Sequence, residues 1–308
     1  MSGKRKIYRS GFLHICQKSV DNGIIFYVLE DFLVFYSVLS VKALVFGIVI
    51  LAIDIMFNHF HLGILCRNDK KLSSFMNSST SVFARMYNRQ YGLKGQLFKR
   101  PFRSVPKMTE TRIRDSLFYI WNNPKEKKIV KLAEEYRWNF LKYLEKDNPY
   151  SEPINLTNAS EHLVSLIREV EARRRTGKYL DYGFFDERYK SLSKDERAQL
   201  IDHIIVSYNV IRRDTLISMF DSYETLLTAV NAVTGNEYGM SDDNDDEDYR
   251  HYRQMVMILK REGIDLDKVR FRPGVFEGNE SLLARLKKLI KAEVGASDYE
   301  IAKFFHLL

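Results

Sequence analysis

Hydrophobic positions divide the first 147 residues into runs typical of strands and runs typical of helices. The predicted strands are 7–19, 48–56 and 59–66. The predicted helices are 29–46, 72–91 and 109–123. Gly47 and Gly92 should end the first two helices, and Pro124 the third, because glycine suits a C-terminal cap and proline disfavours continuation. Strand, helix and paired strands in this order predict an α+β fold with a central antiparallel sheet and flanking helices.

The pattern changes after residue 147. Residues 148–160 are rich in Pro, Asn, Ser and Thr and predict a linker, which gives an N-terminal domain at 1–147 and a mainly helical C-terminal region at 161–308. The helices predicted in that region are 161–175, 193–211 and 215–233. A run of acids predicts a disordered loop at 241–248, and 281–308 predicts part of a helix-turn-helix in which Ser297 caps the last helix.

Charge narrows the class of partner. The net charge of the chain is +8 despite the acidic run, which favours a polyanion, with nucleic acid first and a membrane surface second. The two cysteines imply no disulfide framework and fit a reducing, cytoplasmic location. The apolar stretch 32–53 is long enough to span a bilayer, but Lys42 interrupts it and acids flank it. A buried helix followed by a buried strand explains it equally well, so we expect no membrane span.

Two histidines separated by one residue form the first candidate site. If 59–66 is a strand, His59 and His61 lie on the same face, where neutral imidazoles can bind one divalent metal ion. The opposing interpretation is that the histidines only cap a strand. Cys66 makes a structural zinc site conceivable, but no fourth ligand follows at the usual spacing.

The end of the helix at 109–123 carries the second candidate site. Tyr119 and Asn123 are four residues apart and share a helix face. A phenol and an amide oxygen there could act as nucleophile and third metal ligand. The alternative is an aromatic helix end that packs on the sheet.

A basic segment lies between the last two predicted helices of the N-terminal domain. Residues 95–107 mix cations with aromatic residues, and two arginines follow at the start of the next helix. Charge of this kind holds phosphates, and rings stack on bases, so the segment predicts contact with single-stranded nucleic acid, although a solvated hairpin explains it as well. The candidate DNA-binding residues are Lys99, Arg100, Arg103, Lys107, Arg112 and Arg114.

Together these motifs resemble the HUH-type tyrosine transposases, and most of all the REP-associated, insertion-sequence-like transposase family. The resemblance spans about residues 7 to 145. It is carried by Met56-Phe57-Asn58-His59-Phe60-His61 and Tyr119-Ile120-Trp121-Asn122-Asn123-Pro124, with support from Tyr87-Asn88-Arg89, Gly95-Gln96-Leu97-Phe98 and a first strand that contains His14.

The resemblance implies a ferredoxin-like core and a metal-dependent enzyme that cuts and rejoins single-stranded DNA next to a hairpin. Tyr119 would be the nucleophile, with a 5′-phosphotyrosine intermediate, and His59, His61 and Asn123 would hold Mg²⁺ or Mn²⁺. A homodimer is possible. No nucleotide cofactor is expected, in keeping with a sequence that has no glycine-rich phosphate loop.

Two other functions stay open at this point. A transposase-derived regulator would bind nucleic acid through the basic segment without a working catalytic set. A membrane-associated protein is the third interpretation. The presence of all four candidate catalytic residues favours the enzyme.

Overall fold

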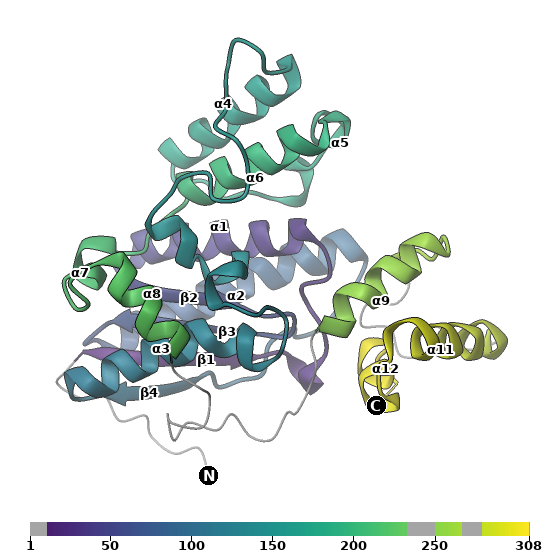
Figure 1. Ribbon diagram of the computed structural model, residues 1–308, viewed down its shortest axis with the longest axis horizontal. Helices are drawn as coiled ribbons and strands as arrows, with labels where there is room; N and C mark the ends of the chain where they lie inside the picture. Colours follow the sequence, from purple (N-terminus) through teal and green to yellow (C-terminus); the bar gives the residue numbers. More distant parts are fainter. Residues whose placement is uncertain (1–10, 233–249, 267–278, 308) are drawn as a thin grey trace.

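The computed structural model describes residues 11–232, 250–266 and 279–307 (Figure 1). At its centre is a four-stranded antiparallel sheet in the order β2-β3-β1-β4. The strands are β1 (Phe12–Lys18), β2 (Val49–Ile55), β3 (His59–Leu65) and β4 (Arg103–Lys107). With α1 (Leu29–Phe46) after β1 and α2 (Asp69–Tyr91) after β3, this is the ferredoxin-like topology. The predicted α+β fold is therefore confirmed.

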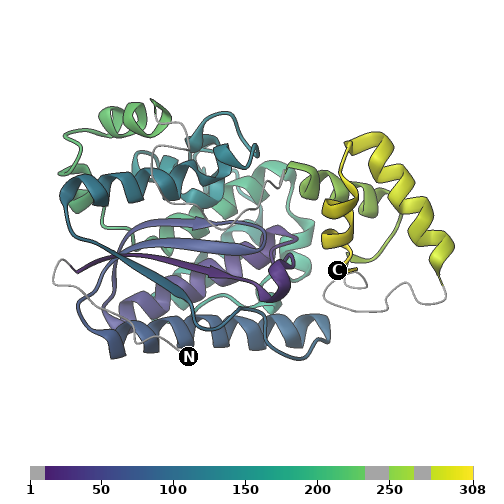
Figure 2. The same cartoon turned by 90° about the horizontal axis from the view of Figure 1, so that it is seen from below.

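Helices cover both faces of the sheet. Figure 2 shows α1 and α2 on one side and α3 (Glu110–Glu126) on the other. Alternate residues of β3 serve the two faces, and the residues that point to α1 and α2 are apolar. Phe60 packs against Phe35 of α1 with 4.9 Å between ring centroids. All of Phe60, Leu62 and Ile64 are fully buried.

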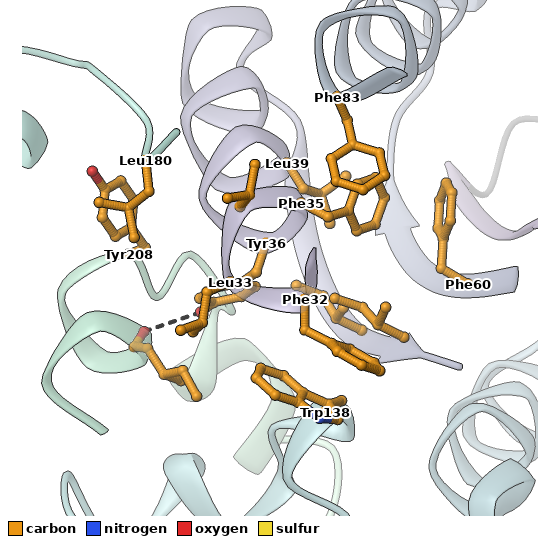
Figure 3. Packing of buried hydrophobic residues seen from close by; sticks show 14 of the residues in the cluster. Phe32, Leu33, Phe35, Tyr36, Leu39, Phe60, Phe83, Trp138, Leu180 and Tyr208 are labelled. Atoms are coloured by element: carbon orange, nitrogen blue, oxygen red, sulfur yellow. Dashed lines mark hydrogen bonds between the residues drawn. The ribbon is translucent and has the colours of Figure 1, made fainter. Parts of the chain in front are cut away.

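The core between the sheet and α1 is dominated by aromatic rings (Figure 3). Phe32 stacks on Trp138 at 4.5 Å, and Phe35 meets Phe83 of α2 edge-to-face at 5.1 Å. The apolar stretch 32–53 is thus the body of α1 followed by most of β2, and both elements are buried except at the C-terminal end of α1. Among the described residues, no helix has the length and hydropathy needed to cross a membrane.

The predicted helices 161–175 and 193–211 pack on the outer side of α1. They are α4 (Glu161–Arg175) and α6 (Lys194–Ser207), with the short α5 (Glu187–Ser191) between them. The Tyr36 hydroxyl of α1 donates a hydrogen bond to the carbonyl of Ile205 at 3.1 Å. These helices and the sheet therefore share one continuous hydrophobic core. Short 3₁₀ segments connect α3 to α4 and α4 to α5, namely Ala133–Glu135, Arg137–Asn139, Leu141–Leu144 and Tyr182–Phe184.

The single helix predicted at 215–233 is wrong. The chain forms α7 (Arg213–Ile217) and α8 (Tyr223–Ala232), and the break between them contains Asp221 with φ of 68°. A non-glycine residue in that left-handed region interrupts a helix. α8 packs against the outer surface of α3, where the Asn122 side-chain amide donates to the carbonyl of Val230.

Three C-terminal helices, α9 (Arg250–Arg261), α11 (Glu280–Val294) and α12 (Asp298–Phe304), form a second small core. Ser297 and Glu300 cap α12 reciprocally, as predicted. The segment before α1 joins this core through Ile24 and Tyr27. The predicted acidic loop at 241–248 lies outside the described residues, and the helix-turn-helix stays a prediction.

One alternative interpretation and one local prediction on the way to the site are also wrong. Residues 95–107 do not form a hairpin, because β4 instead pairs with β1 at the edge of the sheet. Pro124 does not end α3, which continues to Glu126. The missing N–H of proline removes one hydrogen bond, but the helix closes within a turn, with the Lys127 amide bonded to the Asn123 carbonyl.

Candidate active site

The face of β3 opposite the aromatic core carries both histidines. His59 and His61 point toward α3, as the alternation of a strand predicts. Neighbouring strands add polar side chains at the same level. Asp54 of β2 lies directly across from His61, and His14 of β1 lies across from Gly63. Three imidazoles and one carboxylate are thereby gathered beneath a single helix.

Gly63 continues the histidine face and lets α3 come close. A Cβ atom built on Gly63 would lie 3.1 Å from a methyl carbon of Leu117 and 3.3 Å from one of Ile120. Both distances are shorter than ordinary van der Waals contact, so a side chain at this position would push α3 away from the histidines.

α3 brings Tyr119 and Asn123 onto the histidines. The helix begins where predicted, because the Thr109 hydroxyl accepts a hydrogen bond from the Arg112 amide. The Tyr119 ring lies edge-on to two imidazoles, with centroid distances of 5.5 Å to His14 and 5.7 Å to His61. One turn further on, Asn123 Nδ2 lies 3.1 Å from His59 Nε2.

Hydrogen bonds fix the orientation and tautomer of His59. Asn58 Nδ2 donates to the Asn22 carbonyl, so its Oδ1 must be the atom that faces His59 Nδ1 at 2.7 Å. Because Oδ1 can only accept, Nδ1 of His59 carries the proton and Nε2 presents a lone pair. Metal-binding histidines usually donate their other ring nitrogen in this way. The neighbouring His61 is held by a 2.9 Å contact between its Nδ1 and His14 Nε2.

Asp54 is a fully buried acid beside these groups. Its Oδ2 accepts a 3.3 Å hydrogen bond from Asn123 Nδ2, while its Oδ1 has no hydrogen-bond partner within the described part of the chain. Burial raises the pKa of Asp54 well above its usual value, although the bond from Asn123 opposes the shift. A buried carboxyl of this kind favours either a proton or a nearby cation.

The chemical types of these side chains are suitable ligands for a divalent cation. Neutral imidazole, amide oxygen and carboxylate are all ligands for Mn²⁺, and the last two suit Mg²⁺. Asn123 presents its nitrogen to His59, so a rotation of the amide would be needed to place the oxygen there. In the described residues, no three His, Cys, Asp or Glu side chains are already arranged around one point. Cys66, considered for zinc, donates instead to the Asn68 carbonyl.

The candidate site is covered. Tyr119 is 5 % exposed, His59 4 %, and His61 not at all. The surface around α3 must therefore open before any ligand can reach these side chains.

The six predicted DNA-binding residues separate into different places. Arg103 and Lys107 pair with Cys16 and Phe12, which places both on the α3 side of the sheet. Partial burial, followed by the nearby positive charge of Arg112, lowers the pKa of Lys107. Arg114 forms an ion pair with Glu110, one turn earlier on the same helix, and lies over the Phe220 ring.

The other two cations and the aromatic residues behave differently. Arg100 bonds to the Ser81 hydroxyl of α2 on the opposite side of the sheet, and Lys99 bonds to Asn22. Phe98 and Phe102 are buried, with 3 % and 9 % exposure, so these rings belong to the core.

Sequence reasoning gave no role to four residues of the site. His14 was recognised only as part of the first strand, and Asp54, Asn58 and Gly63 were not singled out. One signal was present: Asp54 is the lone acid in an otherwise apolar strand. Its contact with the site could not be read from the sequence, because it depends on the register between β2 and β3.

Comparison with known proteins gives little further information. No protein-family model matches the chain, and no curated protein matches it. A solved structure described as a REP-associated tyrosine transposase bound to a REP hairpin is similar over 46 % of this chain and 84 % of its own, with 14 % identity and a TM-score of 0.39. At that level of likeness, only the residues and geometry of this chain bear on its function.

Proposed function

We propose that this protein is a nuclease and strand transferase that cuts single-stranded DNA through a covalent bond to Tyr119. The observation that carries the proposal is the meeting, within one chain, of the Tyr119 ring with His14 and His61 and of Asn123 with His59. A packed helix end alone would not explain why two histidines lie against the phenol while a third histidine, an amide and a buried acid contact one another on the same face of the sheet.

The step transfers one phosphodiester from the DNA to the protein. The Tyr119 oxygen forms a bond to phosphorus, and the bond between phosphorus and the 3′-oxygen breaks. The proton that leaves the phenol is balanced by the proton that the departing 3′-oxygen takes up, and the neighbouring imidazoles would carry it. The 3′-hydroxyl can then attack the phosphotyrosine in reverse, or another strand can, without a nucleotide cofactor.

A bound Mg²⁺ or Mn²⁺ would draw charge from the non-bridging phosphate oxygens. We assign its ligands to His59, His61 and Asn123, with Asp54 as an additional oxygen donor. The hydrogen bonds from Asn58 to His59 and between His14 and His61 orient the two imidazoles. Imidazole favours Mn²⁺ over Mg²⁺, so we expect Mn²⁺ to bind more tightly.

The phosphate backbone would be held by Arg103, Lys107 and Arg112. All three lie on or beside the face of the sheet that α3 covers. The positive charges of Arg103 and Arg112 contribute to the lowered pKa of Lys107. A phosphate between them would relieve that repulsion. The preferred substrate is therefore a single strand that passes along the start of α3, and DNA with a hairpin nearby is the first substrate to test.

The experiment is capture of labelled single-stranded DNA in the presence of Mn²⁺, followed by denaturing electrophoresis. Wild-type protein should give a slow-migrating adduct, and Tyr119→Phe should give none while it binds DNA with similar affinity. Tyr87→Phe is a matched control, because Tyr87 is buried in α2 on the opposite face of the sheet. An adduct that persists in Tyr119→Phe would overturn the proposal.

A regulator that binds DNA without cutting it is the second candidate, and the burial of the site favours it. With Tyr119 only 5 % exposed, the histidines and the acid could stabilise one another with no substrate. Binding of single-stranded DNA by the wild-type protein, with no adduct under any metal, would support this candidate over the enzyme.

A further inference from the structure

Gln17 is a polar residue on the apolar side of β1. It pairs with Phe60 and is only 4 % exposed. Its Nε2 donates to the Lys99 carbonyl at 3.0 Å, and because a carbonyl only accepts, this bond fixes the amide orientation. Its Oε1 is then left with no hydrogen-bond partner in the described residues. A buried acceptor without a donor costs about 1–3 kcal/mol, so its retention calls for an explanation.

Gln17 lines a cavity of about 360 Å³ between α2 and residues 100–102. Met76 and Phe102 give it apolar walls, and Arg100 belongs to its lining as an exposed cation. A second hollow of about 290 Å³ shares Thr80 and Arg100 with the first. Volumes of this size, with apolar walls and a few polar atoms, are typical of sites for small molecules.

The polar groups of the residues that line the cavity favour a ligand that donates hydrogen bonds. Gln17 Oε1 can only accept, and the Thr80 hydroxyl has committed its proton to the Met76 carbonyl. The positively charged Arg100 guanidinium would bind an anionic group of the ligand. A flat apolar ring with an N–H on its edge and a phosphate attached meets all three requirements.

We propose that this cavity takes one unstacked nucleobase of the DNA strand, with its amino group on Gln17 and its phosphate on Arg100; this rests on the proposed function. Adenine, cytosine and guanine carry an exocyclic amino group, whereas thymine presents two carbonyl oxygens beside its single N–H. The cavity therefore selects the three amino bases over thymine.

The placement of two arginines connects this cavity to the candidate active site. Arg103, at the start of β4, faces the α3 side, while Arg100 lies at the cavity on the α2 side. Both belong to the segment that enters the edge strand of the sheet. A strand held at Tyr119 can thus pass round this edge and place a nearby unpaired base against Gln17.

The test is ligand-observed NMR with dAMP, dCMP, dGMP and dTMP, on the Tyr119→Phe full-length chain without metal. We expect saturation transfer to the three amino nucleotides and at least several-fold less to dTMP. Gln17→Met keeps the bulk but removes the acceptor, so the difference between dCMP and dTMP should disappear. A thermal melt of each variant checks that the fold is retained.

Two variants of α2 distinguish nucleotide binding in the cavity from binding elsewhere on the surface. Asn77→Trp should fill the cavity and abolish nucleotide binding, whereas Ser74→Trp, at an exposed position outside the cavity lining, should not. Equal binding of all four nucleotides, or full displacement by inorganic phosphate with no effect of Asn77→Trp, would overturn the base pocket. Because cutting is not measured, this result is independent of whether Tyr119 acts as a nucleophile.

Discussion

The two faces of the central sheet use the same strand for opposite purposes. On β3, Phe60, Leu62 and Ile64 enter an aromatic core beneath α1 and α2, while His59, His61 and Gly63 meet α3. The first face stabilises the fold by removing apolar surface from water. The second face buries polar groups, whose desolvation is offset in part by the hydrogen bonds between Asn58 and His59, His14 and His61, and Asn123 and Asp54.

The difference teaches which face stabilises the fold and which face would carry the proposed reaction. The aromatic side contacts α1, α2 and the 3₁₀ segments, so its loss should unfold the chain. The polar side is covered mainly by α3, which packs closely against Gly63. Changes there should impair the site while leaving most of the fold intact.

The largest effect on the fold is expected for Phe60→Ala. Phe60 is fully buried among Phe35 and Phe98, so the variant leaves a cavity that costs about 3–5 kcal/mol of unfolding free energy. Urea denaturation measures this loss. A cost no larger than that of a surface substitution would contradict the role assigned to the aromatic face.

His61→Ala, at the next position of β3, should lower the rate of the proposed reaction much more than it lowers stability. Loss of one proposed metal ligand should lower the rate of adduct formation with Mn²⁺ on the order of 100-fold. The unfolding free energy should fall by much less than in Phe60→Ala. Single-turnover kinetics and urea denaturation on the same preparation check both, and an unchanged rate would remove His61 from the site.

Gly63→Val tests the close approach of α3. The new side chain would collide with Leu117 and Ile120, so we expect a loss of about 1–3 kcal/mol together with slower adduct formation. Ala84→Val on the outer part of α2 is a matched control for added bulk. Full activity in Gly63→Val would mean that the distance between α3 and the histidines does not matter.

Asp54→Asn should give the smallest change in the free energy of unfolding. Unlike the other variants, it should stabilise the fold. The pKa of Asp54 is raised in the fold, so its contribution to stability is present at acid pH and is lost as the pH rises above about 4 toward the folded pKa. Without metal, the variant should therefore unfold at higher urea than wild type at pH 8, with a smaller difference at pH 4. Greater stability of wild type at pH 8 would show that Asp54 is compensated by another group.

Much of the fold could be predicted from local pattern. The apolar run followed by Gly47 gave α1 its observed bounds, and the strand periodicity placed both histidines on one face. The pairing of β4 with β1 could not be predicted, because it joins residues far apart in sequence and the basic residues suggested an exposed hairpin.

The same limit applied to the candidate site. Tyr119 and Asn123 were identifiable from their spacing on one helix face. Asp54 and His14 reach the site only through strand register, and the break between α7 and α8 depends on Asp221, a residue that many helices tolerate. Local periodicity thus predicted which elements form, and tertiary pairing decided which residues meet.

The central claim is that the polar face of the sheet is a catalytic site centred on Tyr119. The most direct measurement is mass-spectrometric mapping of the residue that carries DNA after wild-type protein reacts with a single-stranded oligonucleotide and Mn²⁺. We predict one modified peptide, with a 5′-phosphodinucleotide or longer remnant on Tyr119. A remnant on another residue, or none at all while single-stranded DNA is bound, would contradict the claim.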